Sequence, residues 1–362
     1  MATKYQVIAD TLRAHIQAGK YAHATILPSE FAIAREYQVS RQTVRQALAL
    51  LAQDGLIETR RGSGSHILRA LQGSGACRYN IAVVVTYISD YVFPSILREI
   101  ENVLSQQECT SSIFATRNQV SNERKILARL LEQPVDGIIV EATKSALPNP
   151  NLDLYQQLMA RDIPLVFVHG YYAGLPESHF VLDANYDGGL ILSRYLAGQG
   201  CTRIGGIFKS DDIQGHGRYA GYAAGLQEQG LELRDQDVFW FNTGTKNTLL
   251  AGDDSPIRAF LDAALEEVDS FVCYNDEIAY FLEQQLQKRG LRIPEDVALV
   301  SFDNSNYSKL ASVPITSLSH GSGNTGRTAA QMMLRMLKGE YCQSAQVPWE
   351  LVERQSSLRT AK

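Results

Sequence analysis

Two groups of polar side chains in this 362-residue sequence have types and spacings that could do chemistry. The first group is Arg41, Gln42 and Arg45, which on a helix would lie close together and away from the apolar positions. An arginine can donate two hydrogen bonds to a guanine edge, and a glutamine can form two with an adenine. This group therefore indicates contact with DNA bases.

The second group consists of carboxylates, amides, lysines and aromatic residues that follow predicted strands. They occur in segments 87–93, 141–144, 169–172, 183–185, 209–214, 275–276 and 303–304. Because ligands of open parallel sheets bind at the carboxyl ends of the strands, we expect these segments to line one cleft. Acids and amides match adjacent hydroxyl groups, and aromatic faces cover the C–H surface of a sugar ring. The group therefore indicates a site for a neutral polyol.

Short helices followed by a hairpin must position the first group. Apolar spacing predicts helices over 3–18 and 30–37 and a third helix that begins at Arg41, with Ser40 as its N-cap. Val44, Leu48 and Leu51 form the apolar stripe of that third helix, so Arg41 and Arg45 lie on another face. Residues 58–67 alternate through a glycine-rich turn and predict a two-stranded wing. The order of helix, short turn, helix and wing predicts a winged helix-turn-helix.

Strands that alternate with helices must position the second group. Strands are predicted at 81–86, 112–116, 137–141, 165–169, 179–182, 203–208, 270–274, 298–302 and 316–319. Helical patterns of 10–15 residues, such as 96–107, 121–132, 189–199 and 277–289, lie between most of them. This alternation predicts parallel sheets covered on both faces, and the length allows two lobes.

Composition excludes several classes of protein. With 45% hydrophobic and 20% charged residues, the chain is not disordered as a whole, and it has no apolar run of about 18 residues that would span a membrane. The N-terminus has no apolar signal segment, so we expect a cytoplasmic protein without a membrane partner. The five cysteines are scattered, which predicts neither a disulfide framework nor a metal site. We also expect no cofactor.

Charge is distributed unevenly along the chain. Residues 1–70 carry a net charge of +4, and the remaining residues carry −9. A small basic head on an acidic body indicates that only the head meets a polyanion.

The run LPSEFAIAREYQVSRQTVRQALALLAQDGLIETRRGSGSHI closely resembles the winged helix of GntR-type bacterial transcription regulators. The resemblance covers about 65 residues and implies that Glu30, Arg41 and Arg45 contact bases and that Thr43 helps to set the recognition helix on the DNA backbone. It departs at Ser65, where the family wing usually has threonine. The DNA-contacting residues that follow from this resemblance and from the spacing are Lys4, Ser29, Glu30, Ser40, Arg41, Gln42, Thr43, Arg45, Arg60, Arg61 and Gly62.

CYNDEIA, GLRIPEDVALVSFDNS and VPITSLSH resemble the periplasmic-binding-protein-like effector domain of LacI-type repressors. Joined to a GntR-type head, this domain is typical of the L-arabinose-responsive repressors of Gram-positive bacteria, which TYISDYVFPSI, DGIIVEATKSALPNPN and GIFKSDDIQGHGRYAGY also resemble. The resemblance implies two Rossmann-like lobes that close around a sugar, a homodimer and double-stranded operator DNA as partner. It implies direct ligand roles for Arg218, Asn275 and Asp303. The predicted effector-binding residues are Asp90, Tyr91, Phe93, Glu141, Lys144, His169, Tyr172, Asp183, Gln214, Arg218, Asn275 and Asp303.

These predictions divide the chain into a winged-helix DNA-binding domain (1–68), a linker (69–78) and an effector-binding and dimerisation domain (79–362). The expected function is that of a ligand-responsive repressor of carbohydrate utilisation with L-arabinose as effector, and the first alternative is the same architecture with another small molecule. The second alternative is a sugar-binding or sugar-modifying α/β protein. No GxSxG, HExxH, P-loop or strand-linked GxGxxG motif is present, so we do not expect an enzyme.

Overall fold

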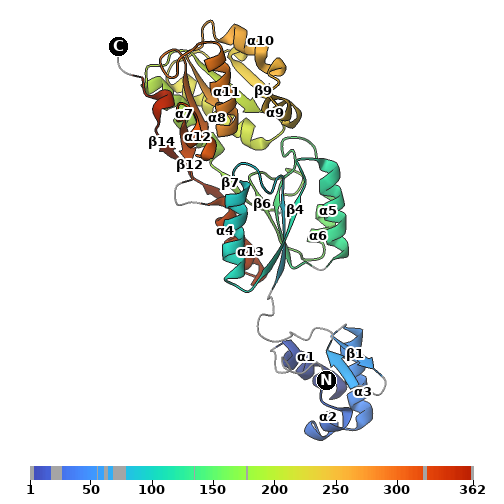
Figure 1. Cartoon of the computed structure of the whole chain (residues 1–362). Helices are drawn as coiled ribbons and strands as arrows, with labels where there is room; N and C mark the ends of the chain where they lie inside the picture. The colour runs from blue at the N-terminus through green and yellow to red at the C-terminus, as the bar shows by residue number, and fades with distance from the viewer. Residues whose placement is uncertain are drawn as a thin grey trace. The chain divides into compact units, whose positions relative to one another are not determined.

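The computed structural model describes residues 4–17, 27–54, 56–60, 64–67, 79–133, 135–176, 178–320 and 324–359. By its internal contacts the chain divides into two compact units, Met1–Arg78 and Tyr79–Lys362. In Figure 1 the first unit is blue and the second runs from cyan to red. The predicted linker, 69–78, lies outside the described residues. Among the described helices, none is long and apolar enough to cross a membrane.

The first unit is the predicted winged helix-turn-helix. Its elements are α1 (Lys4–Gln17), α2 (Glu30–Glu36), α3 (Arg41–Gln53), β1 (Ile57–Arg60) and β2 (Gly64–Ile67). One apolar core joins the three helices, with Leu12, Ile33 and Val44 each fully or almost fully buried. β1 and β2 pair antiparallel and form the two strands of the wing.

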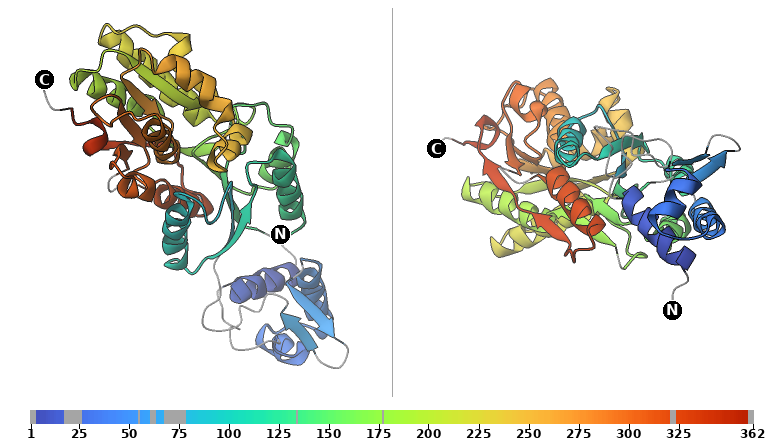
Figure 2. Two further views of the ribbon diagram at one scale, coloured as in Figure 1. Left: turned by 45° about the horizontal axis from the view of Figure 1, so that its top comes forward. Right: turned by 90° about the horizontal axis from the view of Figure 1, so that it is seen from below.

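The second unit contains two six-stranded sheets, each of which forms one lobe. The sheet of lobe 1 has the order β13-β7-β6-β5-β3-β4, and that of lobe 2 has the order β14-β12-β11-β10-β8-β9. All neighbouring strands are parallel except β12 and β14. The two sheets and their helices can be followed in Figures 1 and 2.

Lobe 1 is built from β3 (Asn80–Val85), α4 (Phe93–Ser105), β4 (Thr110–Ala115), α5 (Val120–Glu132), β5 (Gly137–Glu141), α6 (Leu152–Met159), β6 (Leu165–Val168), β7 (His179–Asp183), α13 (Thr325–Leu337) and β13 (Ala345–Val347). Strand β3, next to the edge strand β4, is buried on both faces, as a parallel strand between two helical layers requires. Val83 packs toward α4 and α13, and the next residue, Val84, packs toward α5 and α6.

Lobe 2 is built from α7 (Asn185–Gly198), β8 (Ile204–Lys209), α8 (Ile213–Glu228), η1 (Asp235–Asp237), β9 (Val238–Phe241), α9 (Thr243–Leu250), α10 (Ser255–Ala264), β10 (Ser270–Cys273), α11 (Asp276–Lys288), β11 (Ala298–Phe302), α12 (Asn306–Leu310), β12 (Thr316–Ser319), β14 (Glu350–Val352) and η2 (Gln355–Ser357). Phe271 of β10 packs toward α9, α10 and α11, and Val272 packs toward α7 and α8.

The chain passes between the lobes three times, from β7 to α7, from β12 to α13 and from β13 to β14. All three crossovers lie at the same edge of the two sheets, where β13 and β7 face β14 and β12. The cleft between the lobes therefore has a connected side and, at β4 and β9, an unconnected side.

The predicted parallel two-lobed fold is confirmed, but three strands were not predicted. β13 and β14 have three residues each, too few for a periodic pattern to be read. β9 forms the exposed edge of its sheet, and its apolar run Val238–Phe241 is only four residues long.

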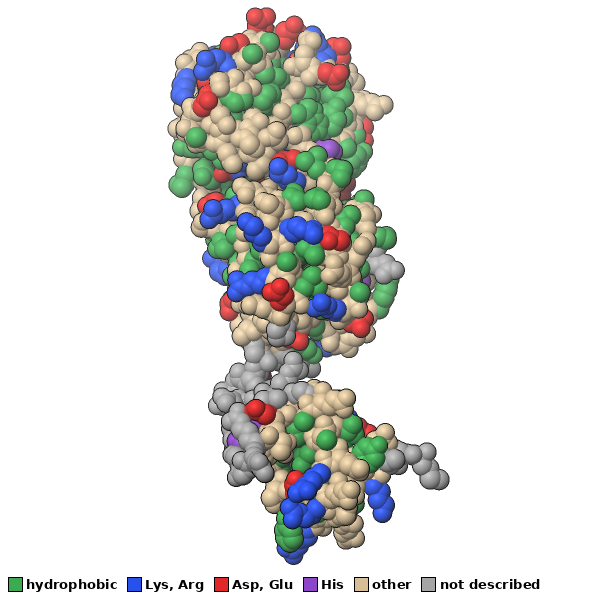
Figure 3. Space-filling model, turned by 90° about the vertical axis from the view of Figure 1, so that its right-hand side faces the viewer, with side chains coloured by type: hydrophobic (Ala, Val, Ile, Leu, Met, Phe, Trp, Pro, Cys, Tyr) green, Lys and Arg blue, Asp and Glu red, His purple; other side chains and the backbone are tan. Residues whose placement is uncertain are grey.

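Charged side chains are not spread evenly over the second unit. On the face shown in Figure 3, Lys and Arg gather over lobe 1, and acidic side chains gather at the end of lobe 2. Helix α5 contributes Arg124, Lys125 and Arg129 to lobe 1. The net negative charge of the second unit is therefore not a uniform property of its surface.

Candidate functional site

The polar face of α3 is presented to solvent by the way the helix starts and packs. Ser40 caps the helix, since its Oγ accepts a hydrogen bond of 3.2 Å from the backbone N–H of Thr43. Val44 and Leu51 are fully buried, which turns Arg41, Gln42 and Arg45 outward. The three side chains that could read base edges therefore lie on one exposed surface.

Glu30, the first residue of α2, pairs with both arginines of α3. Its carboxylate accepts hydrogen bonds from Arg45 Nε at 3.0 and 3.1 Å and from Arg41 Nη2 at 3.3 Å. The arginine side chains remain 61% and 65% exposed. Glu30 thus holds two long cationic side chains in place without covering them.

Other predicted DNA contacts have different positions. Ser29 caps α2, because its Oγ accepts from Ala32 N, and Lys4 is exposed at the start of α1. The Thr43 hydroxyl is hydrogen-bonded to that of Ser40 at 2.9 Å. Arg61, Gly62 and the side chain of Arg60 lie outside the described residues.

A cavity of about 230 Å³ lies between the two lobes of the second unit. The ends of strands from both sheets line it, as expected for parallel sheets. Tyr91, His169 and Asp303 line it from backbone positions with φ of 58°, 60° and 93°. Left-handed backbone is rare in residues other than glycine and gathers at ligand-binding sites.

Arg218 of α8 is the most deeply buried cation of the cavity, with 2% of the residue exposed. Its guanidinium carbon lies 4.2 Å from the ring centre of Phe302 and 4.8 Å from that of Tyr274. Its Nε donates to Asn185 Oδ1 at 3.0 Å, and Nη2 lies 3.3 Å from Asp303 Oδ1. Aromatic faces and polar partners therefore fix the orientation of the guanidinium.

Close contact between α7 and α8 places Arg218. A Cβ added at Gly189 would lie 2.1 Å from the carbonyl oxygen of Arg218, and one at Gly221 would lie 1.8 Å from that of Tyr186. Only glycine allows this approach of two helix backbones.

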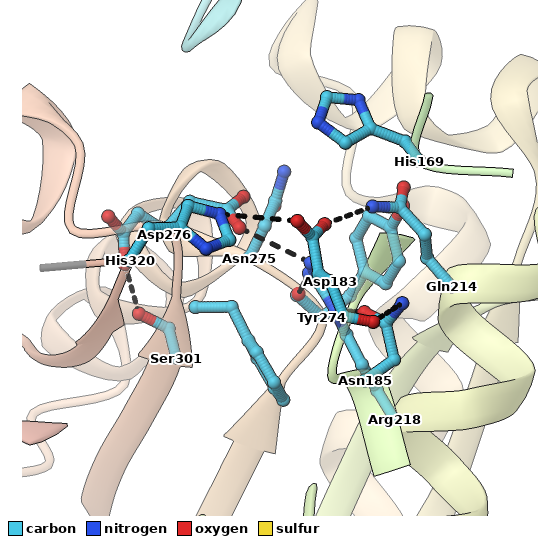
Figure 4. A network of polar contacts seen from close by, with 12 residues as sticks. His169, Asp183, Asn185, Gln214, Arg218, Tyr274, Asn275, Asp276, Ser301 and His320 are labelled. Carbon is cyan, nitrogen blue, oxygen red and sulfur yellow. Dashed lines mark hydrogen bonds and ion pairs between the residues drawn. The ribbon is translucent and has the colours of Figure 1, made fainter. Parts of the chain in front are cut away.

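Asp183, the last residue of β7 in lobe 1, contacts lobe 2 on the crossover side of the cleft (Figure 4). Its Oδ2 accepts from Gln214 Nε2 at 2.9 Å, and its Oδ1 accepts from Thr325 Oγ1 at 3.0 Å. His320 Nε2 lies 3.4 Å from Oδ1, and the His320 ring stacks on Trp349 with ring centres 4.0 Å apart. Burial opposes the charge of Asp183, but His169, His320 and Arg218 hold its pKa below the usual value.

His169 and Glu141 form an ion pair at the ends of β6 and β5. His169 Nδ1 lies 3.7 Å from Glu141 Oε1, and Glu141 Oε2 accepts from the backbone N and the hydroxyl of Thr86 at 2.6 Å each. Burial disfavours the imidazolium, but the carboxylates of Asp183, Glu141 and Asp303 outweigh it and raise the pKa of His169 to about 9. The histidine is therefore charged at neutral pH.

Two lysines of lobe 2 also have carboxylate partners. Lys209 Nζ contacts Asp212 and lies 3.5 Å from Asp211 Oδ1, and Lys246 Nζ lies 2.5 Å from Glu277 Oε2. Burial disfavours the charge of Lys209, but these aspartates raise its pKa above the ordinary value.

Tyr91 connects the two lobes from the β3 side. Its hydroxyl donates to Asp303 Oδ2 at 2.7 Å and accepts from the backbone N–H of Asp276 at 3.2 Å. Asp276 is itself fully buried, and its Oδ1 accepts hydrogen bonds from the hydroxyls of Ser301 in β11 and Ser317 in β12. Burial raises the pKa of Asp276 to about 6.

The structure brings most of the predicted effector residues to this cavity. Those that line it are Tyr91, Phe93, Glu141, His169, Asp183, Gln214, Arg218, Asn275 and Asp303. Asn275 lines the cavity and also caps α11, because its Oδ1 accepts a hydrogen bond from the backbone N–H of Ile278 at 3.1 Å.

Three predicted residues do not line the cavity. Tyr172 is buried inside lobe 1, where its hydroxyl donates to Glu123 Oε1 at 2.6 Å. Lys144 contributes its backbone N–H to Asn118 Oδ1 from a left-handed turn. Asp90 is exposed to solvent and accepts from Ser89.

Several lining residues were not predicted, among them Asn118, Lys209, Asp212, Lys246 and His320. Lys209 and Asp212 lie in segment 209–214, which is predicted to follow a strand and to line the cleft. Asn118 and His320 follow predicted strands by one or two residues, so a consistent use of the strand-end rule finds them. Lys246 lies inside α9, where no sequence signal separates it from a surface lysine.

Two family models match separate parts of the chain. Residues 4–67 match the gntR family of bacterial regulatory proteins, and residues 193–357 match a periplasmic binding protein-like domain. The arabinose metabolism transcriptional repressor of Halalkalibacterium halodurans is 33% identical over 348 residues, which are 94% of this chain and 91% of that protein. The repressor of the same name from Geobacillus stearothermophilus is 32% identical over 92% of this chain and 91% of its own length.

The chain belongs to the family of arabinose metabolism transcriptional repressors. As a family member it is a transcriptional repressor with a GntR-type DNA-binding head. Solved structures support the fold of its second unit. A LacI-type regulator of Alkaliphilus metalliredigens complexed with D-xylulofuranose has a TM-score of 0.65 and 22% identity over 78% of this chain and all of its own. The regulator CelR in complex with cellobiose has a TM-score of 0.66 and 24% identity over 88% of this chain and 92% of its own.

Proposed function

We propose that this repressor acts in the cytoplasm as a homodimer that binds operator DNA of arabinose utilisation genes and releases it when L-arabinose enters the cleft. Two relatives that cover over 90% of the chain are named as arabinose metabolism repressors, which supports the choice of sugar. The protein binds the sugar and does not convert it.

The pairing of charges in the cleft is the observation that carries the proposal. His169, Lys209, Arg218 and Lys246 each face a carboxylate, namely Glu141, Asp212, Asp303 and Glu277. An anionic sugar would bring an extra buried charge and face carboxylates, which is costly. Paired acids and bases instead offer both donors and acceptors to the hydroxyl groups of a neutral sugar.

The size of the cavity supports a small ligand. Its volume of about 230 Å³ is below the ~300–1,000 Å³ typical of sites for drug-sized molecules. A monosaccharide suits this space better than a disaccharide.

On the DNA side, the two heads of the dimer would occupy half-sites of a pseudo-palindromic operator. Arg41 and Arg45, held by Glu30, would contact base edges from the major groove. Contacts of other basic side chains with phosphate would make the affinity fall steeply with salt.

Sugar and DNA would be coupled through the two lobes. The sugar favours the closed lobes, and closure changes how the two heads of the dimer are held. Because such coupling is reciprocal for binding, operator DNA must weaken sugar binding by the factor by which sugar weakens DNA binding.

Fluorescence anisotropy of a labelled duplex from upstream of the gene tests the proposal. We expect tight binding that L-arabinose abolishes and that D-xylose, D-galactose and D-ribose leave unchanged. Release by one of the control sugars instead would assign the effector to that sugar and overturn arabinose. Recovery of the added sugar unchanged after incubation, measured by chromatography, separates a repressor from a sugar-modifying protein.

A further inference from the structure

A second set of side chains connects the lobes, and one of them, Asn118, also lines the sugar cavity. Asn118 follows β4 in lobe 1, and its Nδ2 donates to Thr243 Oγ1, at the start of α9 in lobe 2, at 2.7 Å. Thr243 then donates from its hydroxyl and from its backbone N–H to Asp211 Oδ2, at 2.7 and 3.0 Å. We refer to Asn118, Thr243 and Asp211 as the interlobe network.

Each end of the network is anchored in its own lobe. Asn118 has φ of 51° and accepts at Oδ1 from the backbone N–H of Lys144 at 2.8 Å. Asp211 is paired with Lys209 through Oδ1 at 3.5 Å. The carbonyl oxygen of Asp211 also accepts from Ala146 N at 3.3 Å, which adds a second connection between the lobes.

The network is shielded from water. Asn118, Thr243 and Asp211 are 2%, 8% and 3% exposed. Opening the cleft would separate Asn118 from Thr243 and transfer both groups to water, whereas closing it exchanges those water contacts for the bond. The bond stabilises the closed state by the difference in free energy between the Asn118–Thr243 hydrogen bond and the hydrogen bonds to water that it replaces.

The position of the interlobe network in the fold allows it to affect how easily the cleft opens. The three crossovers lie at the β13/β7 and β14/β12 edge of the sheets, and β4 and β9 are the opposite edge strands. Asn118 follows β4, and Thr243 follows β9. The network therefore joins the lobes at the unconnected side of the cleft, where opening moves them furthest apart.

We propose that Asn118, Thr243 and Asp211 are positioning residues that set the equilibrium between open and closed lobes and thereby the sugar concentration at which the repressor responds. This inference rests on the proposed function for its sugar readout. Thr243 does not line the cavity, so it would act on sugar affinity only through closure. When only the closed fraction holds the sugar tightly, the apparent Kd rises in proportion as that fraction falls.

The test uses the full-length protein and replaces the hydroxyl of Thr243 by a methyl group in Thr243→Val. We expect the Kd for L-arabinose, measured by calorimetry, to rise about fivefold. Operator affinity without sugar should stay within twofold of the wild type. Thr248→Val is the matched control, because Thr248 is on the same helix and, among the described residues, its hydroxyl donates only to Gly244 O of that helix. Thr243→Ser, which keeps the hydroxyl, should restore the wild-type Kd.

A second measurement reports closure directly and needs no sugar. Spin labels at exposed positions of α5 and α9, introduced by Ser121→Cys and Asn247→Cys in a Cys77→Ser background, give the distance distribution between the lobes. We expect Thr243→Val to shift this distribution to longer distances and Thr248→Val to leave it unchanged. An unchanged distribution together with an unchanged Kd would overturn the inference. If the wild type binds no arabinose, the proposed effector fails, and the distance distribution alone still decides whether the network holds the lobes.

Discussion

Both carboxylate oxygens of Glu30 accept hydrogen bonds from Arg45 Nε, at 3.1 and 3.0 Å, across the turn that separates α2 from α3. An acid at a surface that should meet DNA is unfavourable by charge alone. The Glu30 carboxylate favours base recognition in another way, because it orders the Arg45 guanidinium, which then loses less conformational entropy when it binds a base edge.

Removal of Glu30 should therefore have opposite effects on two kinds of DNA. Glu30→Ala takes away a negative charge, which should strengthen binding to unrelated duplex, and it frees Arg41 and Arg45, which should weaken operator binding about tenfold. Anisotropy titrations of both duplexes at one salt concentration measure this. Equal changes for the two duplexes would show that Glu30 acts by charge only.

Arg45→Ala should lower specific operator affinity by about 10- to 100-fold, as expected for loss of a bidentate base contact. Sugar binding measured by calorimetry should not change, because the substitution lies in the other unit. Operator affinity that persists at moderate salt would remove Arg45 from the base contacts.

Asp303→Ala should give a repressor that binds its operator but is no longer released by sugar. The change removes the acceptor of Tyr91 and the partner of Arg218, both of which line the cavity. We expect the Kd for L-arabinose to rise about 10- to 100-fold. Asp262→Ala, at an exposed aspartate of α10, is the control and should respond normally. Normal release of Asp303→Ala would place Asp303 outside the ligand contacts.

Two glycines of one helix offer a matched test of the α7 and α8 contact. Gly189→Ala would bring Cβ to 2.1 Å from the carbonyl oxygen of Arg218 and should displace α8, with a loss of both thermal stability and sugar affinity. At Gly198, on the same helix, nothing lies within 4 Å of an added Cβ, so Gly198→Ala should keep or slightly raise the Tm. Similar melting temperatures for the two variants would contradict this account of the packing.

His169 predicts how stability changes with pH. Its pKa rises from 6.5 in the unfolded chain to about 9 in the folded one, so between these values the folded protein holds a proton that the unfolded chain has lost. The contribution is complete below pH 6.5 and disappears as the pH rises through 9, with a size on the order of 2 kcal/mol. Urea unfolding of wild type and His169→Gln at pH 6.5 to 9.5 checks this. The difference between their unfolding free energies should shrink as the pH rises, and a constant difference would contradict the charged state of His169.

Local pattern was sufficient to predict the fold and much of the cleft. Strands such as β3 and β5 are mostly apolar, because helices cover both faces of the sheet, and such runs are visible in the sequence. The rule that ligands lie beyond strand ends then located Tyr91, Asp183 and Asp303.

The failures came from contacts between residues far apart in sequence. Tyr172 is an aromatic residue beyond a strand end, as expected for a residue that stacks on a sugar. Its hydroxyl instead donates a hydrogen bond to Glu123, 49 residues earlier, inside lobe 1. Thr243 resembles any residue at a helix start, and only the tertiary fold brings Asn118 to it. Such pairings follow from how strands are ordered in a sheet, which the sequence does not state directly.

The three passages of the chain between the lobes also constrain how the protein can be made. Lobe 1 takes its last helix and its edge strand from residues 325–347, after nearly all of lobe 2 has been synthesised. During translation lobe 1 stays incomplete until then, because the sheet face that α13 covers and the edge of β7 that pairs with β13 are still open. For the same reason, no single cut in the chain separates the two lobes, so recombination could exchange the DNA-binding head but not one half of the sensor.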